Sequence, residues 1–124
     1  LGVCPENASS LLAPQIFGYQ RAAELLLLGE AFNADTALEI GLVNKILPPS
    51  EVNVSAQALA KKLAAKPLAS ILATKALLKK TQSAQIRQVI TDEAQTFGKM
   101  LGEPAAKEAM SAFMEKRKPD FSQL

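Results

Sequence analysis

Proline and glycine residues divide this sequence into short segments of helical pattern, and their spacing limits the fold more than any other feature. The breaks fall at Gly18, Gly29, Gly41, Pro48, Pro49, Pro67, Gly102 and Pro104. Glycine often ends a helix and proline cannot continue one, so each break should separate two elements. The longest unbroken apolar run, Leu25 to Leu28, is far shorter than the roughly 20 residues that cross a bilayer. We therefore expect several short amphipathic helices that need packing partners.

The first part of the chain should contain three short helices and one strand. We expect helices from Ser9 or Ser10 toward Phe17, from Tyr19 to Leu28 and from about Ala34 to Ile40. Either serine could cap the first helix, which Pro14 should kink or shorten, and Asn33 should cap the third. The hydrophobic segment 42–47, which two prolines follow, is the one strand that the sequence predicts.

From Ser50 onward every segment has a helical pattern. The predicted helices run from a cap at Ser50 to before Pro67, from about Leu68 to Lys80, from roughly Ala84 to Leu101, and from Pro104 to before Pro119. The third of these carries an apolar stripe at three- and four-residue steps, made of Ile86, Val89, Ile90, Ala94, Phe97 and Leu101. The stripe predicts a long helix with one face against a partner.

Composition excludes several kinds of site. With 124 residues, 48% of them hydrophobic and 21% charged, the chain fits one globular unit that can bury a core. Cys4 is the single cysteine, so the chain has no internal disulfide. Because it has no histidine, neither a Cys/His zinc site nor a Ser-His triad can be assembled from these residues. A net charge of +2 is too small to indicate nucleic-acid binding, which needs clustered basic residues and a supporting motif.

Four sequence blocks occur in an order that resembles a known family. They read LGVCPENASSLLAP, AAELLLLGEAFNADTALEIGLVNKILPP, KPLASILATKALLKK and EKRKPDF. This order is similar to that of the enoyl-CoA hydratase/isomerase (crotonase) family. The resemblance implies a mainly α fragment of the α/β crotonase fold, a spiral of ββα units. Residues 1–49 would end the catalytic spiral, and residues 50–124 would form the C-terminal helical oligomerisation segment, which makes trimers in the family.

The resemblance also implies an acyl-CoA substrate, so coenzyme A is part of the substrate and no separate cofactor is expected. In the family, two backbone N–H groups hold the thioester oxygen and stabilise the anion that forms on it. The motifs that supply them, an early strand-to-helix turn and a Gly-Gly turn, do not occur in these residues. The chain by itself should therefore be inactive. The full-length protein should be a homo-trimer or hexamer with no nucleic-acid partner and no membrane span.

Glu6 is the candidate catalytic residue. Its loop, Pro5-Glu6-Asn7-Ala8-Ser9-Ser10, resembles that of Δ3,Δ2-enoyl-CoA isomerases, in which a glutamate is the base. Such a carboxylate takes a proton from C2 of a 3-enoyl thioester and returns it at C4. Without the resemblance, an acid just before a helix is usually structural. Asn7 stands where Gly or Ala is more usual in the loop, and asparagine tolerates a left-handed backbone.

Phe97 and Lys116 are candidates for binding the coenzyme A part of the substrate. They stand at the spacing of an aromatic residue and a lysine that, in hydratase-like relatives, reach coenzyme A bound by a neighbouring subunit. The ring would lie against the adenine, and the ammonium would pair with phosphate. Read without the resemblance, Phe97 is a core residue on an apolar stripe, and Lys116 belongs to a solvated basic helix end.

Two other functions stay open from the sequence. An enoyl-CoA hydratase would use two glutamates that precede Leu1, and Glu6 would then have no catalytic role. Alternatively, the chain is a non-catalytic helical module for oligomerisation or coenzyme A binding. The location we expect is the cytoplasm, with the peroxisome as an alternative because the C-terminal Ser-Gln-Leu resembles a peroxisomal address.

Overall fold

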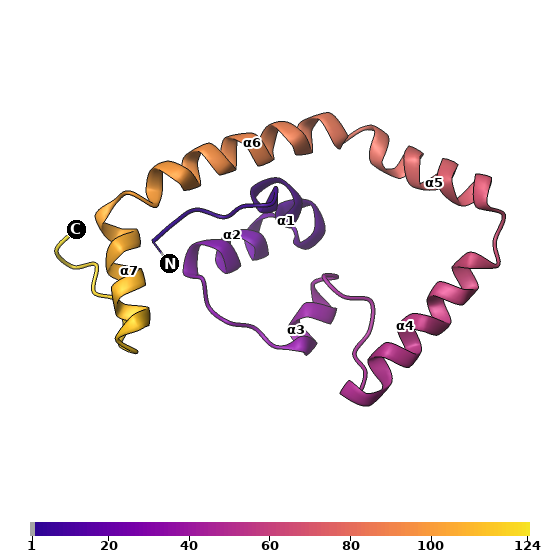
Figure 1. Cartoon of the computed structure of the whole chain (residues 1–124), viewed down its shortest axis with the longest axis horizontal. Helices are drawn as coiled ribbons and strands as arrows, with labels where there is room; N and C mark the ends of the chain where they lie inside the picture. Colours follow the sequence, from indigo (N-terminus) through magenta and orange to yellow (C-terminus); the bar gives the residue numbers. More distant parts are fainter. Residues whose placement is uncertain (1) are drawn as a thin grey trace.

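The computed structural model describes residues 2–124, in which all regular structure is helical. Its seven helices are α1 (Ser9–Phe17), α2 (Tyr19–Leu28), α3 (Ala34–Glu39), α4 (Pro49–Ala64), α5 (Leu68–Lys80), α6 (Ser83–Met100) and α7 (Pro104–Met114). They form an open arch in which α6 runs beside α1, while α5 and α4 lead away from it and α3 lies on the inner side (Figure 1). No helix of the described residues is long and apolar enough to cross a membrane.

Helices α1 and α2 pack against each other as a helical hairpin, and Gly18 makes the turn between them. Gly18 has φ 78°, a conformation that residues with a side chain rarely adopt. Small side chains face each other in this hairpin, since Ala13 and Ala22 are buried. Helix α1 continues past Pro14 to Phe17, its predicted end, so of the two expected effects of Pro14 the shortening does not occur. Packing against α2 holds the last turn in place.

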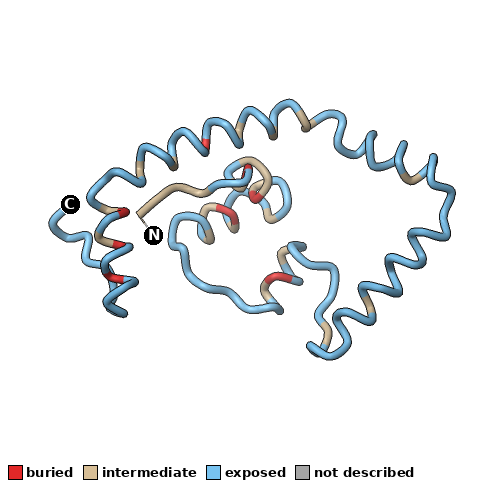
Figure 2. Tube along the Cα trace, in the orientation of Figure 1, coloured by how far each residue is buried: buried red, intermediate tan, exposed pale blue. Residues whose placement is uncertain are grey.

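The buried residues are small, and most of the large apolar side chains remain exposed. The buried hydrophobic residues are Ala8, Ala13, Ala22, Ala37, Ala106, Ala109 and Ala112. In contrast, α4 and α5, which we call the α4–α5 arm, contain no buried residue (Figure 2). Leu68 and Leu78 on this arm are 71% and 77% exposed. The apolar stripes that the sequence predicts on these helices therefore have no partner among the described residues.

The N-terminal segment lies against α6 and α7. A Cβ atom on Gly2 would lie 2.7 Å from the backbone carbonyl carbon of Ala105, a distance that only glycine permits. Gly2 also has φ 68°. Farther along, the Cys4 Sγ donates to the Glu93 carbonyl oxygen at 3.9 Å. Segments far apart in sequence thus converge near α7 (Figure 1).

Helix caps are partly as predicted. Asn33 caps α3, because its Oδ1 accepts a hydrogen bond from the Thr36 N–H at 2.9 Å. The predicted serine caps are wrong. Helix α4 starts with Pro49 in its first turn, where the missing N–H costs nothing, and Ser50 lies inside the helix. At the start of α1 the capping residue is Ala8, which has no side chain that could accept a hydrogen bond.

The predicted strand at 42–47 is wrong, because the start of this segment closes α3. Gly41 has φ 76°, and the N–H groups of Leu42 and Val43 both donate to the Ala37 carbonyl at 2.9 and 3.2 Å. This is a helix-ending motif of the Schellman type. The remainder runs along α4, where Lys45 donates to Ser55 Oγ. No described segment offers a strand edge with which 42–47 could pair.

Replacing the α3 cap should destabilise the protein. Asn33→Ala removes the acceptor for the Thr36 N–H, and we expect the free energy of unfolding to fall by about 1 kcal/mol. Asn53→Ala is the matched control, since Asn53 lies on the exposed face of α4 and alanine is the better helix former there. Urea unfolding followed by circular dichroism measures both. Equal losses for the two variants would contradict the capping role of Asn33.

Candidate functional site

Glu6 begins a tight turn that leads into α1. The Glu6 carbonyl oxygen accepts from the Ser9 N–H at 3.2 Å and from the Ser9 hydroxyl at 2.6 Å. The two central residues are both left-handed, with φ 61° at Asn7 and 59° at Ala8, as in a type I′ turn. The left-handed conformation expected to be tolerated by Asn7 is confirmed. For Ala8 this conformation costs about 1–2 kcal/mol.

The side chain of Glu6 is exposed. Its Oε1 accepts a hydrogen bond from the Asn7 Nδ2 at 3.3 Å. Among residues 2–124 it takes part in no salt bridge, because the ion pairs there join Arg21 to Glu24 and Arg117 to two other acids. The carboxylate is therefore open to a molecule that approaches from outside the described chain.

A second carboxylate, that of Glu93 on α6, accepts hydrogen bonds from the same turn. It is 7% exposed, and its Oε2 accepts from the Ala8 N–H at 2.6 Å. Its Oε1 accepts from the N–H and the hydroxyl of Ser10 at 2.9 and 2.5 Å. These N–H groups belong to the first turn of α1, where the helix dipole favours a negative charge. Glu93 thus caps a helix that begins far away in the sequence.

A hollow of about 340 Å³ opens beside this contact. It lies between the N-terminal loop and α6, and its lining residues are Cys4, Pro5, Ser10, Val89, Asp92, Glu93 and Thr96. Glu6 is part of this loop but does not line the hollow. No cluster of three or more His, Cys, Asp or Glu side chains suited to a metal occurs in the described part of the chain.

Phe97 lies on α6 and Lys116 follows the end of α7, so the three predicted site residues do not form one cluster of contacts. Phe97 is partly buried on α6, one turn beyond Glu93. Lys116 is exposed directly after α7, with φ 55°. The Lys116 N–H donates to the Phe113 carbonyl oxygen at 3.2 Å, and the Arg117 N–H donates to the Ala112 carbonyl oxygen at 3.0 Å. Lys116 thus occupies the position of a Schellman cap that glycine usually takes.

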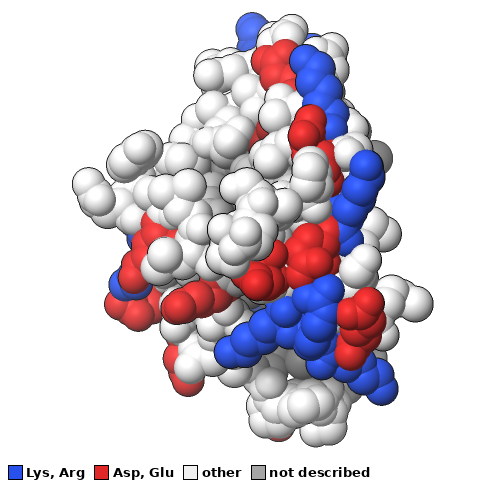
Figure 3. Space-filling view, turned by 90° about the vertical axis from the view of Figure 1, so that its left-hand side faces the viewer, with Lys and Arg blue, Asp and Glu red and all other residues white. Residues whose placement is uncertain are grey.

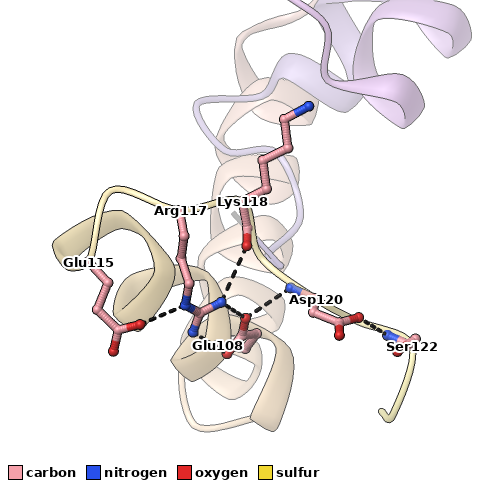
Figure 4. A network of polar contacts seen from close by, with 6 residues as sticks. All are labelled: Glu108, Glu115, Arg117, Lys118, Asp120 and Ser122. Atoms are coloured by element: carbon pink, nitrogen blue, oxygen red, sulfur yellow. Dashed lines mark hydrogen bonds and ion pairs between the residues drawn. The ribbon is translucent and has the colours of Figure 1, made fainter.

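Arg117 ties the C-terminal tail back to α7 (Figure 4). Its Nη2 lies 3.0 Å from Glu108 Oε2, its Nη1 donates to the other oxygen of Glu108, and its Nε donates to Glu115 at 2.6 Å. The Asp120 N–H also donates to Glu108, at 2.9 Å. The hydrogen bonds from Arg117 and then from Asp120 lower the pKa of Glu108 to about 2. On the face shown in Figure 3, basic and acidic side chains lie next to each other and form no single basic field.

The whole chain, residues 1–124, matches the family model for enoyl-CoA hydratase/isomerase. The chain belongs to this family. In structure it is similar to an enoyl-CoA hydratase/isomerase from Pseudoalteromonas atlantica, with a TM-score of 0.91 and 30% sequence identity over 98% of this chain and 49% of that one. The helical arch is therefore a fragment of the crotonase fold.

Relatives of known name are hydratases and isomerases of enoyl-CoA. The chain is 32% identical over 121 residues to a crotonyl-CoA hydratase of Syntrophomonas wolfei, covering 98% of this chain and 46% of the relative. It is 33% identical over 112 residues to a peroxisomal Δ3,5-Δ2,4-dienoyl-CoA isomerase of Arabidopsis thaliana, covering 90% and 40%. The chain spans about half the length of the curated relatives it matches.

The sequence did not predict that Glu93 binds the turn that carries Glu6. Glu93 lies on the apolar stripe of α6, four residues after Val89 and four before Phe97. An acid at a core-facing position of an amphipathic helix needs hydrogen-bond donors, since a buried unpaired charge is costly. An acid on an apolar stripe was therefore the sequence feature that could have indicated a buried, hydrogen-bonded role for Glu93. The identity of the donors could not be inferred, because they come from a loop more than eighty residues away.

The Arg117 network should come apart in acid. The pKa of Glu108 lies near 2 in the folded protein against an ordinary value of 4.5. A lowered pKa means that the stabilisation is complete above pH 4.5 and is lost as the pH falls toward 2. We expect the protection factor for hydrogen exchange at the Asp120 amide, which corrects the measured rate for the intrinsic pH dependence of exchange, to fall across this range. In Glu108→Gln the protection factor should be low already at pH 6, and a protection factor equal to that of the parent protein at pH 6 would contradict the assignment.

Proposed function

We propose that this chain is part of an enzyme that moves the double bond of a 3-enoyl-CoA to position 2, with Glu6 as the single base. The observation that carries the proposal is the exposed Glu6 carboxylate on a fixed turn ahead of α1. The loop around it resembles that of Δ3,Δ2-enoyl-CoA isomerases. Membership of the enoyl-CoA hydratase/isomerase family supports an acyl-CoA substrate.

The chemistry needs one carboxylate that reaches two carbon atoms. The Glu6 carboxylate would take a proton from C2, and the electron pair would spread over C2, C4 and the thioester oxygen as a dienolate. The protonated Glu6 would then return the same proton at C4, so that the reaction consumes nothing else. The negative charge on the thioester oxygen needs two N–H donors, which we expect from residues outside this chain. We therefore expect the isolated chain to be inactive.

Removal of the Glu6 charge tests this proposal. In the protein that carries this chain, Glu6→Gln keeps the side-chain size but cannot accept the C2 proton. We expect kcat for isomerisation of a 3-enoyl-CoA to fall by at least about 100-fold, with little change in KM. The measurement is the steady-state rate of 2-enoyl-CoA formation. Glu39→Gln, an exposed glutamate at the end of α3, is the control and should keep the full rate.

A hydratase is the second candidate, favoured by relatives named crotonyl-CoA hydratase and short-chain-enoyl-CoA hydratase. Such an enzyme would add water to a 2-enoyl-CoA with two glutamates that lie outside these residues. The same Glu6→Gln variant separates the two functions. Loss of isomerisation supports the proposal, whereas unchanged isomerisation together with efficient hydration in this variant would refute it.

We also propose that Phe97 and Lys116 contact the coenzyme A part of the substrate. The support is the exposure of Lys116 and its fixed backbone at the end of α7. Phe97 is only partly buried, so part of its ring remains accessible to an adenine. As in family members, the substrate they contact would be held by a neighbouring subunit of a trimer or hexamer. The exposed apolar residues of the α4–α5 arm support such an assembly.

Lys116→Gly separates binding from folding. Glycine fits the left-handed position at φ 55° better than lysine, so the variant should be at least as stable as the parent protein. If the ammonium pairs with a phosphate, KM for acyl-CoA should rise by roughly three- to tenfold. KM for the matching acyl-pantetheine, which has no nucleotide, should not change. Lys118→Ala is the control, and an equal rise of KM there would argue against a specific role for Lys116.

A further inference from the structure

Within residues 2–124 the buried carboxylate of Glu93 forms no salt bridge, and the hydrogen bonds that it accepts there come from the loop that carries Glu6. The carboxylate accepts three hydrogen bonds, two from Ser10 and one from the Ala8 N–H. Hydrogen bonds to an ionised acceptor contribute more than neutral ones, typically about twice as much. The Glu93 side chain therefore provides a large part of the interaction that holds this loop on α6.

The turn that Glu93 holds is a strained one. Ala8 is left-handed and its side chain is completely buried, so it can neither relax easily nor gain anything from solvent. A non-glycine residue in this conformation persists when its surroundings determine it. The short contact of 2.6 Å between Glu93 and the Ala8 N–H supplies that constraint at the strained residue itself.

The constraint reaches Glu6 through the backbone. Ser9 lies between the two residues that Glu93 binds, and its N–H and hydroxyl both donate to the Glu6 carbonyl. Residues 6–10 thus form one hydrogen-bonded unit that is anchored to α6 at Ala8 and Ser10. We therefore expect a change in the anchor to shift the direction in which the Glu6 side chain leaves the turn.

We infer that Glu93 is a positioning residue, which fixes the strained turn so that the Glu6 carboxylate stays in reach of the substrate; this rests on the proposed role of Glu6. Glu93 need not touch the substrate, because it acts on the turn from the buried side. Proton transfer depends steeply on geometry, and a displacement of the order of 1 Å can cost about 100-fold in rate. A loosened turn should therefore affect turnover more than binding.

Glu93→Gln tests the inference in the protein that carries this chain. Glutamine has the same shape, but its NH₂ group must face one of the three donors, so one anchor is lost. We expect kcat for isomerisation to fall by about 10- to 100-fold while KM for the acyl-CoA stays within about twofold. Hydrogen exchange at Ala8 and Ser10 should accelerate. Glu103→Gln, at an exposed glutamate before α7, is the control and should change neither quantity.

A double mutant separates positioning from a purely structural role. If Glu93 acts through Glu6, then kcat of Glu6→Gln/Glu93→Gln should equal that of Glu6→Gln alone, because no base remains to be positioned. A further loss of rate in the double mutant would overturn the inference, and so would an unchanged kcat in the single Glu93→Gln variant. If instead Glu6→Gln keeps full isomerase activity, the proposed function itself fails, which is a distinct result.

Ser10→Ala keeps the test decisive if Glu93→Gln does not fold. This variant removes only the hydroxyl donor at 2.5 Å and leaves both N–H bonds to Glu93. We expect kcat to fall by about threefold or more, again with KM unchanged and with no further loss in the Glu6→Gln background. A folded Ser10→Ala protein with the parent kcat would overturn the inference.

Discussion

The hydrogen bonds of the Glu93 carboxylate join the N-terminal loop and the start of α1 to α6. Helix α6 comes late in the sequence and α1 comes early, and their contact brings the N-terminal loop onto the long helix. The buried apolar residues are alanines, which contribute little buried area each. The arrangement of the loop, α1 and α6 therefore depends strongly on a charge that is satisfied by backbone N–H groups at a helix start.

The sequence predicted the helices because their ends are encoded locally. The observed bounds of α2, Tyr19–Leu28, and of α5, Leu68–Lys80, agree with the prediction, since Gly18 and Gly29 flank α2 and Pro67 precedes α5. The failures came from long-range or competing structure. The strand at 42–47 was inferred from apolar content, but the chain uses Gly41 and the two following N–H groups to close α3. Serine caps were predicted for α1 and α4. Instead, α4 begins with a proline, and the distant Glu93 carboxylate accepts hydrogen bonds from N–H groups at the start of α1.

The candidate site was predictable to different degrees for the same reason. Glu6 and Asn7 follow from a local motif, and the left-handed backbone of Asn7 is a property of that residue type. The catalytic role of Glu6 stays a prediction, as do the roles of Phe97 and Lys116. Glu93 could be noticed only as an acid on an apolar stripe, because hydrogen-bond partners separated by 83 and 85 positions leave no trace in local sequence.

The separation between Glu93 and the loop it anchors has a consequence for folding. The contact from Glu93 to Ala8 closes a segment of 85 positions, and contacts of such long range form late because the chain entropy must be lost first. Helices α1 and α2 can pair early, since they adjoin each other in sequence. The turn at Asn7 and Ala8 cannot be fixed until α6 has been synthesised and has docked. During biosynthesis the loop that carries Glu6 therefore emerges before α6 but acquires its final geometry only after α6 has docked.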